Sequence, residues 1–346
     1  MFLSIIIVVV GLSLLILVHE AGHFFTAKFF NLKIEEFGFG MPPRAIGKKI
    51  GETIYSLNWL PFGGFVKIYG EEGAGKTETG KTSSDAERSF YFQVPWKRAV
   101  IVVAGVVMNF VVGWLLLSAV FMIGSPDGVI ITAVGDNSPA KIAGLEMGDR
   151  IMGFGNSSDA FAKYIDGAKG QEINLNVIKG GKETTVKITP RISPPEGEGP
   201  LGVTLDNGGQ RDGFLEGLKD GFLASIYIIK MVFLGLGSLI AGLFHGNADL
   251  SGVVGPVGIF KIAIQAGGIG IVYLLQLVAL ISVNLAVINI MPFPALDGGR
   301  FLFIIIEKIK GSPLPQKFEQ WANSIGFAFL LLLIFAITAR DIVHLF

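Results

Sequence analysis

Residues 2–23 read Phe-Leu-Ser-Ile-Ile-Ile-Val-Val-Val-Gly-Leu-Ser-Leu-Leu-Ile-Leu-Val-His-Glu-Ala-Gly-His, a long apolar run that ends in the pattern H-E-x-x-H. A helix of the first 18 residues would be about 27 Å long, close to the thickness of a bilayer's hydrocarbon core. The stretch therefore predicts a membrane-spanning helix with two histidines, His19 and His23, in or at the edge of lipid. Ionisable groups at that depth are costly and usually functional.

His19 and His23 lie four residues apart, so they share one face of a helix. Two imidazoles at this spacing can hold one zinc ion, and the adjacent Glu20 can take a proton from water at the metal. The pattern also arises by chance, and a buried His–Glu pair can be structural, satisfied by hydrogen bonds. We favour the metal site because the pattern lies in an apolar segment and uses two of the four histidines.

The composition points to a membrane protein with several spans. Of 346 residues, 51% are hydrophobic and 16% are charged, and the mean hydropathy is +0.60, which is too apolar for a soluble protein of this size. The net charge of zero suggests no nucleic-acid partner. The absence of cysteine excludes disulfides and thiol catalysis. The N-terminus lacks the basic region and the cleavage site of a signal peptide, so we expect a retained anchor.

We expect a polytopic α-helical membrane protein with four transmembrane helices, one β-hairpin and one inserted α+β domain. The expected order is a first span at 1–24, a cytoplasmic-side region at 25–97, a second span at 98–123, a folded insert at 125–206, membrane-associated segments at 207–268, a third span at 269–299, a cytoplasmic loop at 300–323 and a fourth span at 324–346. Eleven Lys and Arg, counting Arg98, lie between the first two spans, and four lie within 300–321. By the positive-inside rule both regions are cytoplasmic, so the two termini and the insert lie on the extracytoplasmic side.

Residues 222–244 are apolar enough to cross the membrane, apart from Lys230. A full crossing would place the basic residues after Asp297 outside, against the charge rule. It would also put Asp297 roughly 25 to 30 Å from the histidines, about the thickness of the hydrocarbon core. We therefore expect amphipathic or re-entrant segments at 207–268.

Two other regions carry β patterns. Within Glu52 to Glu71, apolar and β-branched residues alternate on both sides of Leu-Pro-Phe-Gly-Gly, which predicts a β-hairpin. The polar stretch 71–88 predicts a flexible loop. In the insert we expect strands at Val129 to Val134, 172–179 and 184–190, with a short helix after Pro139.

A catalytic zinc site needs a third protein ligand and an open position. With cysteine absent, and with His245 and His344 expected far from the inner end of the first span, Asp297 is the candidate. It follows two prolines where the third span ends. The alternative is an aspartate that only terminates a helix at the cytoplasmic face.

These motifs resemble the site-2 proteases, which are intramembrane zinc metalloproteases, and most closely the bacterial regulator-of-sigma-E protease branch. The similar stretches are His19-Glu-Ala-Gly-His23, Asn289-Ile-Met-Pro-Phe-Pro-Ala-Leu-Asp297-Gly, Gly255-Pro-Val-Gly-Ile259 and a PDZ-like Ser138-Pro-Ala-Lys-Ile-Ala-Gly-Leu-Glu-Met-Gly-Asp-Arg-Ile151. The resemblance implies zinc held by His19, His23 and Asp297, with Glu20 as general base. It implies that Asn284 and Asn289 contact the substrate and that the hairpin at 52–71 docks it.

The resemblance also implies a bacterial inner membrane location and cleavage within the transmembrane helix of a single-span substrate, such as an anti-sigma factor or a remnant signal peptide. Pro200 to Leu205 resembles the carboxylate-binding loop of a PDZ domain, which would bind a C-terminal peptide, or it is a plain edge strand. Two features depart from this branch. Ala104 to Asn109 lacks the proline of the usual Ala-Gly-Pro-x-x-Asn, and the chain has room for one PDZ domain where some members have two.

We therefore expect a zinc-dependent intramembrane endopeptidase. A non-catalytic PDZ scaffold with a vestigial metal site is the main alternative, and the intact Glu20 argues against it. A metal transporter would need polar residues on several spans, but the second and fourth spans offer little beyond Asn109. On a regular helix Asn284 and Asn289 would be about 140° apart, so they share a face only if the helix is distorted.

Overall fold

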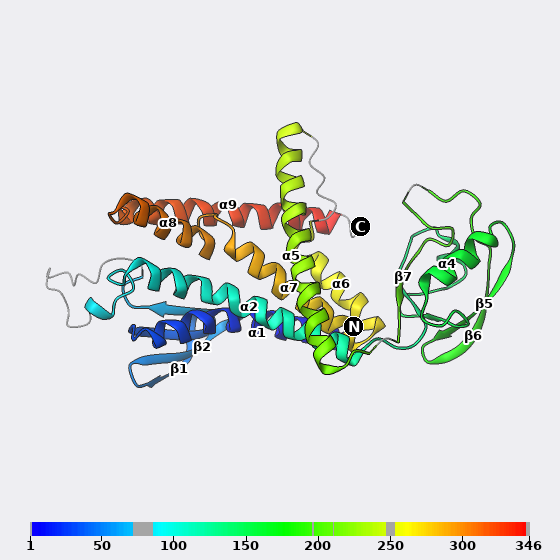
Figure 1. The fold of residues 1–346 in the computed structure, drawn as a ribbon, viewed down its shortest axis with the longest axis horizontal. Coiled ribbons are helices and arrows are strands. Elements are labelled where there is room, and N and C mark those ends of the chain that lie inside the picture. Colours follow the sequence, from blue (N-terminus) through cyan, green and yellow to red (C-terminus); the bar gives the residue numbers. More distant parts are fainter. Residues whose placement is uncertain (1, 72–85, 196, 210, 247–252, 344–346) are drawn as a thin grey trace. The chain divides into compact units, whose positions relative to one another are not determined.

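The computed structural model describes residues 2–71, 86–195, 197–209, 211–246 and 253–343, which form helices with two β-sheets (Figure 1). The elements in chain order are α1 (Phe2–Phe29), β1 (Ile34–Ile50), β2 (Thr53–Ile68), the 3₁₀ helix η1 (Ala86–Arg88), α2 (Pro95–Ile123), β3 (Val129–Val134), α3 (Pro139–Ile142), β4 (Arg150–Ile151), α4 (Ser158–Gly167), β5 (Ile173–Lys179), β6 (Lys182–Ile188), β7 (Val203–Asn207), α5 (Phe214–His245), α6 (Pro256–Ile269), α7 (Ile271–Ile290), α8 (Asp297–Lys310) and α9 (Gln316–Val343). The loop expected at 71–88 lies mostly outside the described residues.

The chain divides into two compact units. The first unit contains the insert and comprises Met1–Ile5, Leu116–Leu223 and Lys261–Leu277. The second unit contains the two histidines and comprises Ile6–Leu115, Ala224–Phe260 and Val278–Phe346.

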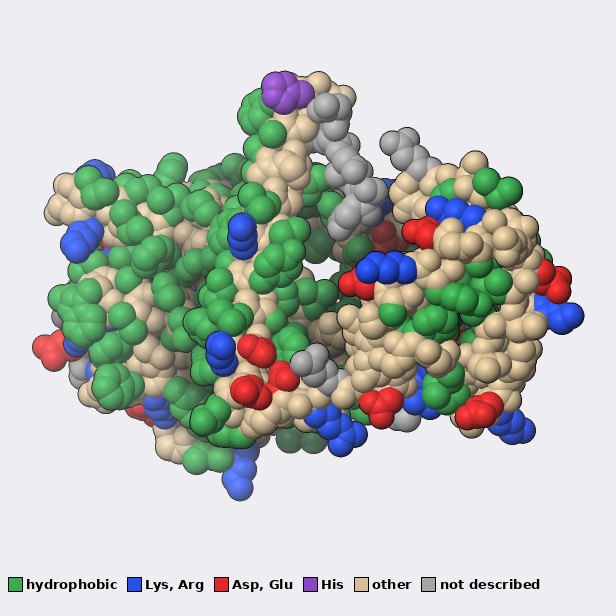
Figure 2. Space-filling model, turned by 45° about the vertical axis from the view of Figure 1, so that its right-hand side comes forward, with side chains coloured by type: hydrophobic (Ala, Val, Ile, Leu, Met, Phe, Trp, Pro, Cys, Tyr) green, Lys and Arg blue, Asp and Glu red, His purple; other side chains and the backbone are tan. Residues whose placement is uncertain are grey.

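Five of the described helices are long and apolar enough to cross a membrane: α1, α2, α5, α7 and α9. The prediction of a largely helical membrane protein with some β structure is therefore confirmed. Four of these helices correspond to the expected spans. The fifth is Phe214–Gly242 of α5, so the expected number of spans stays a prediction. On the face drawn in Figure 2, hydrophobic side chains cover much of the surface of the helices, as lipid contact requires, whereas the insert carries scattered charged side chains.

The predicted hairpin at 52–71 is wrong in its pairing. Residues 53–68 form one long strand, β2, whose partner is β1, and the hairpin turn lies at Gly51 and Glu52. Within β1, residues 36–39 pair with both 54–57 and 64–67. The two runs that the sequence predicted to pair with each other, around 54–57 and 64–67, thus lie on opposite sides of β1. The sequence did not predict β1 as a strand, because its Gly, Pro and charged residues are depleted in strands and break the alternation of apolar and polar residues.

The insert folds around its own core. Its five strands are ordered β6-β5-β4-β3-β7, and every pair is antiparallel. Phe161 and Ile165 of α4 pack with Val129, Ile131 and Val177 of the strands in one buried cluster. The expected strand at Val129–Val134 and the short helix beginning at Pro139 are confirmed. Gly144 follows that helix at φ +77°, a conformation that suits glycine.

The stretch after α7 differs from the expected loop. α7 ends at Ile290, before Pro292 and Pro294, and Asp297 begins a new helix, α8, that continues to Lys310. A Cβ at Gly298 would collide with the backbone oxygens of Ile290 and Met291. Glycine is therefore needed at position 298, because α8 packs directly on the end of α7.

Candidate active site

Close packing of α1 against α2 builds the site. A Cβ at Gly22 would lie 2.6 Å from the carbonyl oxygen of Ala104, so the two helix backbones nearly touch there. On the opposite side of this contact, a Cβ at Gly105 would collide with the ring of His23 and lie 2.9 Å from Cε1 of His19. Glycine at both positions therefore lets α2 approach the two imidazoles.

His19, His23 and Asp297 converge, with one ligand atom from each lying within 4.8 Å of the others. Asp297 Oδ2 lies 2.9 Å from Nε2 of His19 and 3.4 Å from Nε2 of His23, and the two Nε2 atoms are 3.2 Å apart. Each side chain is at most 15% exposed. Two imidazole nitrogens and one carboxylate oxygen form the donor set of a catalytic zinc site that keeps a fourth position open.

The orientation of His23 also suits a metal. Its Nδ1 lies 2.8 Å from the carbonyl oxygen of Ile101 on α2, and a carbonyl can only accept a hydrogen bond. Nδ1 of His23 therefore carries the proton, and Nε2 directs a lone pair at the cluster. Such a second partner is the usual support of a metal-binding histidine.

Charge favours the ionised form of Asp297, which lies outside the candidate membrane helices. Burial raises the pKa of Asp297, but the imidazoles of His19 and His23 beside the carboxylate outweigh it, so this pKa lies below its ordinary value. Three residues further along α8, Arg300 pairs with Glu71, whose charge raises the pKa of the guanidinium. The ion pair links the first turn of α8 to the chain just after β2.

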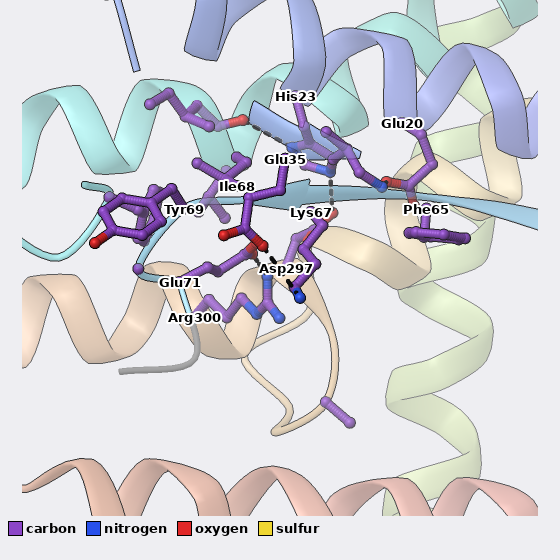
Figure 3. Close-up of a pocket in the computed structure, with 16 residues that line it drawn as sticks. Glu20, His23, Glu35, Phe65, Lys67, Ile68, Tyr69, Glu71, Asp297 and Arg300 are labelled. Carbon is purple, nitrogen blue, oxygen red and sulfur yellow. Dashed lines mark hydrogen bonds and ion pairs between the residues drawn. The ribbon is translucent and has the colours of Figure 1, made fainter. Parts of the chain in front are cut away.

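Glu20 and β2 border a cavity of about 660 Å³ beside the cluster. In Figure 3, His23 and Asp297 point toward each other, and Arg300 and Glu71 pair at the same cavity. The carboxylate of Glu20 accepts a hydrogen bond from the backbone N–H of Val66, 3.1 Å away. A segment of β2 therefore passes directly beside the carboxylate expected to act as base.

The family model of peptidase family M50 matches residues 7–333. The chain belongs to peptidase family M50. This membership confirms the expected resemblance to site-2 proteases and shows that the chain is an enzyme of peptide hydrolysis.

Similar proteins come from several bacteria. A Clostridium perfringens protein provisionally named a zinc metalloprotease is 35% identical over 343 residues, which cover 98% of each chain. The zinc metalloprotease RasP of Shouchella clausii is 30% identical and covers 96% of this chain and 97% of its own. The regulator of sigma-W protease RasP of Bacillus subtilis is 26% identical, with 99% of each chain covered.

The expected substrate-binding residues Asn284 and Asn289 are placed on α7, and both are half-buried. Neither is among the described residues that line the cavity. Sequence reasoning missed the contact of Gly105 with the two histidines and the carbonyl of Ile101, because a small residue and a backbone oxygen leave no chemical signal. It noted Asn109 as a polar residue in an apolar span and as the end of the Ala104–Asn109 stretch, but gave it no role at the site.

Proposed function

We propose that this chain is a zinc-dependent intramembrane endopeptidase that cleaves transmembrane segments of single-span membrane proteins at the His19, His23 and Asp297 cluster. The convergence of these three side chains beside Glu20 carries the proposal. It agrees with the metal in the names of the M50 relatives and with the apolar helix that contains both histidines.

The donor atoms fit the metal. His23 is held with its Nε2 lone pair toward the cluster, and Oδ2 of the buried Asp297 lies within 3.4 Å of the Nε2 atoms of both histidines. Bound to these atoms, zinc would supply a Lewis acid that activates water and polarises the scissile carbonyl. Glu20 would then accept the proton of the attacking water and return it to the leaving amine.

A transmembrane substrate has its carbonyls tied in helical hydrogen bonds, so it must become extended before hydrolysis. The part of β2 near Val66 suits this step because a strand can bind an extended peptide by backbone hydrogen bonds. The N–H of Val66 points at Glu20, and Phe65 and Lys67 line the cavity. We assign substrate docking to this part of β2, with Asn289 and Asn284 of α7 as further contacts.

We place the protein in the bacterial cell membrane with four spans, and with its termini and the 125–206 insert on the extracytoplasmic side. We assign the insert to the PDZ fold, on the sequence 138–151 and on its antiparallel sheet with a packed helix. We propose that it rejects substrates that still carry a bulky extracytoplasmic part. The other candidate role is capture of a C-terminal peptide along β7, which follows the loop at Pro200.

The test combines metal analysis with cleavage of a model single-span substrate by purified protein in detergent or liposomes. Wild type should contain zinc and cut within the transmembrane segment. Glu20→Gln should keep zinc and its thermal stability but lose turnover, because an amide cannot accept the proton. Substantial cleavage by Glu20→Gln would refute the assigned base, and a metal-free, active wild type would refute the zinc site.

A further inference from the structure

Asn109 is a buried amide on α2 beside one of the two histidines. The residue is 1% exposed, and its Nδ2 lies 3.3 Å from Nδ1 of His19. Its Oδ1 is buried with no hydrogen-bond partner among the described residues. A buried polar atom without a partner is costly, so the arrangement calls for an explanation.

The two histidines differ in what supports them. His23 faces a backbone carbonyl, which accepts only, so one tautomer is fixed. His19 instead faces the amide of Asn109, which can donate through Nδ2 or accept through Oδ1. Because the amide nitrogen and oxygen are similar in size, a 180° rotation of the amide exchanges them with little change in packing.

Each orientation of the amide suits a different form of His19. When Nδ2 donates to Nδ1, the ring proton lies on Nε2 and can be donated to Asp297 Oδ2, 2.9 Å away. To bind a metal, Nε2 must give up that proton and present a lone pair. The proton then resides on Nδ1, which needs an acceptor, and Oδ1 of the rotated amide supplies it.

We propose that Asn109 is a positioning residue that selects the tautomer of His19, its Oδ1 accepting from Nδ1–H so that Nε2 presents a lone pair to zinc. This inference rests on the proposed zinc site. It gives the partnerless Oδ1 a role.

Ser282 on α7 offers a matched control. Its hydroxyl donates to the backbone oxygen of Asn109 over 2.7 Å, and the residue is fully buried. Ser282→Ala removes a buried hydrogen bond of the same residue without touching the Asn109 amide. A purely structural role of Asn109 would make the two sites behave alike.

The experiment measures zinc affinity by chelator competition in the Glu20→Gln background, together with thermal unfolding of each zinc-free protein. Asn109→Leu, similar in size but without an acceptor, should weaken zinc binding about 10- to 100-fold, as loss of a histidine's second partner typically does. Asn109→Asp, a permanent acceptor, should bind zinc at least as tightly as Asn109 does. Ser282→Ala should leave the affinity unchanged.

Asn109→Ala is the second variant if the leucine variant does not fold, and it should show the same loss. Zinc binding by Asn109→Leu or Asn109→Ala as tight as with Asn109 would overturn the inference, as would an equal loss in Ser282→Ala. Failure of the proposed zinc site is a separate result, because the Glu20→Gln parent itself would then bind no zinc.

Discussion

Gly105 of α2 lies against the ring of His23 of α1, so closely that any Cβ at Gly105 would enter the space of the imidazole. The same glycine approaches Cε1 of His19. A residue with no side chain thus fixes how near α2 comes to both histidines, while the carbonyl of Ile101 one turn earlier orients His23.

Gly105→Ala should therefore displace both imidazoles. We expect zinc affinity to fall by about 10-fold or more, as it does when the support of a metal ligand is disturbed, with a parallel loss of turnover. The control is Gly237→Ala on α5, where no described atom would lie within 4 Å of the new methyl group. That variant should keep zinc, because the new methyl group contacts nothing at the site. It should also keep its fold, because alanine is a better helix former than glycine by about 1 kcal/mol. Equal zinc affinity in both variants would show that the contact between Gly105 and the two imidazoles can accommodate a methyl group, which would contradict the prediction.

Asp297→Ala should lose most of its zinc and all measurable turnover, because one of three protein ligands is removed. Asp297→Asn, which keeps the size and a carbonyl oxygen but not the charge, should bind zinc more weakly than wild type. Metal content measured on purified proteins checks both. Full zinc occupancy and activity in Asp297→Ala would mean that another residue is the third ligand.

Labelling of introduced cysteines tests the topology, since the chain has no cysteine of its own. With α5 on the extracytoplasmic side, His245→Cys and Glu183→Cys should react with an impermeant thiol reagent added to intact cells, and Ser312→Cys should be protected. All three side chains are exposed. If α5 crosses the membrane, His245→Cys should be protected and Ser312→Cys labelled, and the argument that brings Asp297 to the inner side would fail.

Deletion of 129–205 with a flexible replacement linker separates the two roles of the insert. A folded domain of this length is roughly 25 Å across, large enough to exclude a bulky neighbouring domain. If the insert is a size filter, full-length substrates become cleavable and truncated substrates are cut as before. If it captures peptides, truncated substrates are cut more slowly and full-length substrates stay intact, which would refute the filter.

A point substitution within the intact domain controls this deletion. The substitution should alter β7, the strand proposed to bind a peptide, without disturbing the core of the domain. Leu201 is buried and belongs to that core, so the exposed Thr204 of β7 is the better target. Thr204→Pro removes one backbone donor from β7. Peptide capture predicts slower cleavage of truncated substrates by this variant, whereas a size filter predicts no change as long as the domain remains folded.

The sequence by itself determined the local features of this protein. The apolar run before His19 specified a long helix, and the spacing of His19 and His23 placed both imidazoles on one face, because helical periodicity is set within a few residues. The strand at Val129–Val134 followed from local pattern in the same way. The family motif around Asp297 pointed to the third member of the cluster with His19 and His23, although the sequence contains no distance between Asp297 and α1.

Only the tertiary structure decided which distant residues meet. The partner of His23 lies 78 residues away in the chain, and that of His19 lies 90 residues away. The position of β1 between two parts of β2 likewise depends on long-range pairing that its glycines and prolines conceal. Periodicity shows which face of an element is apolar, but backbone oxygens, glycine contacts and amide orientation acquire meaning only once two packed elements bring them together.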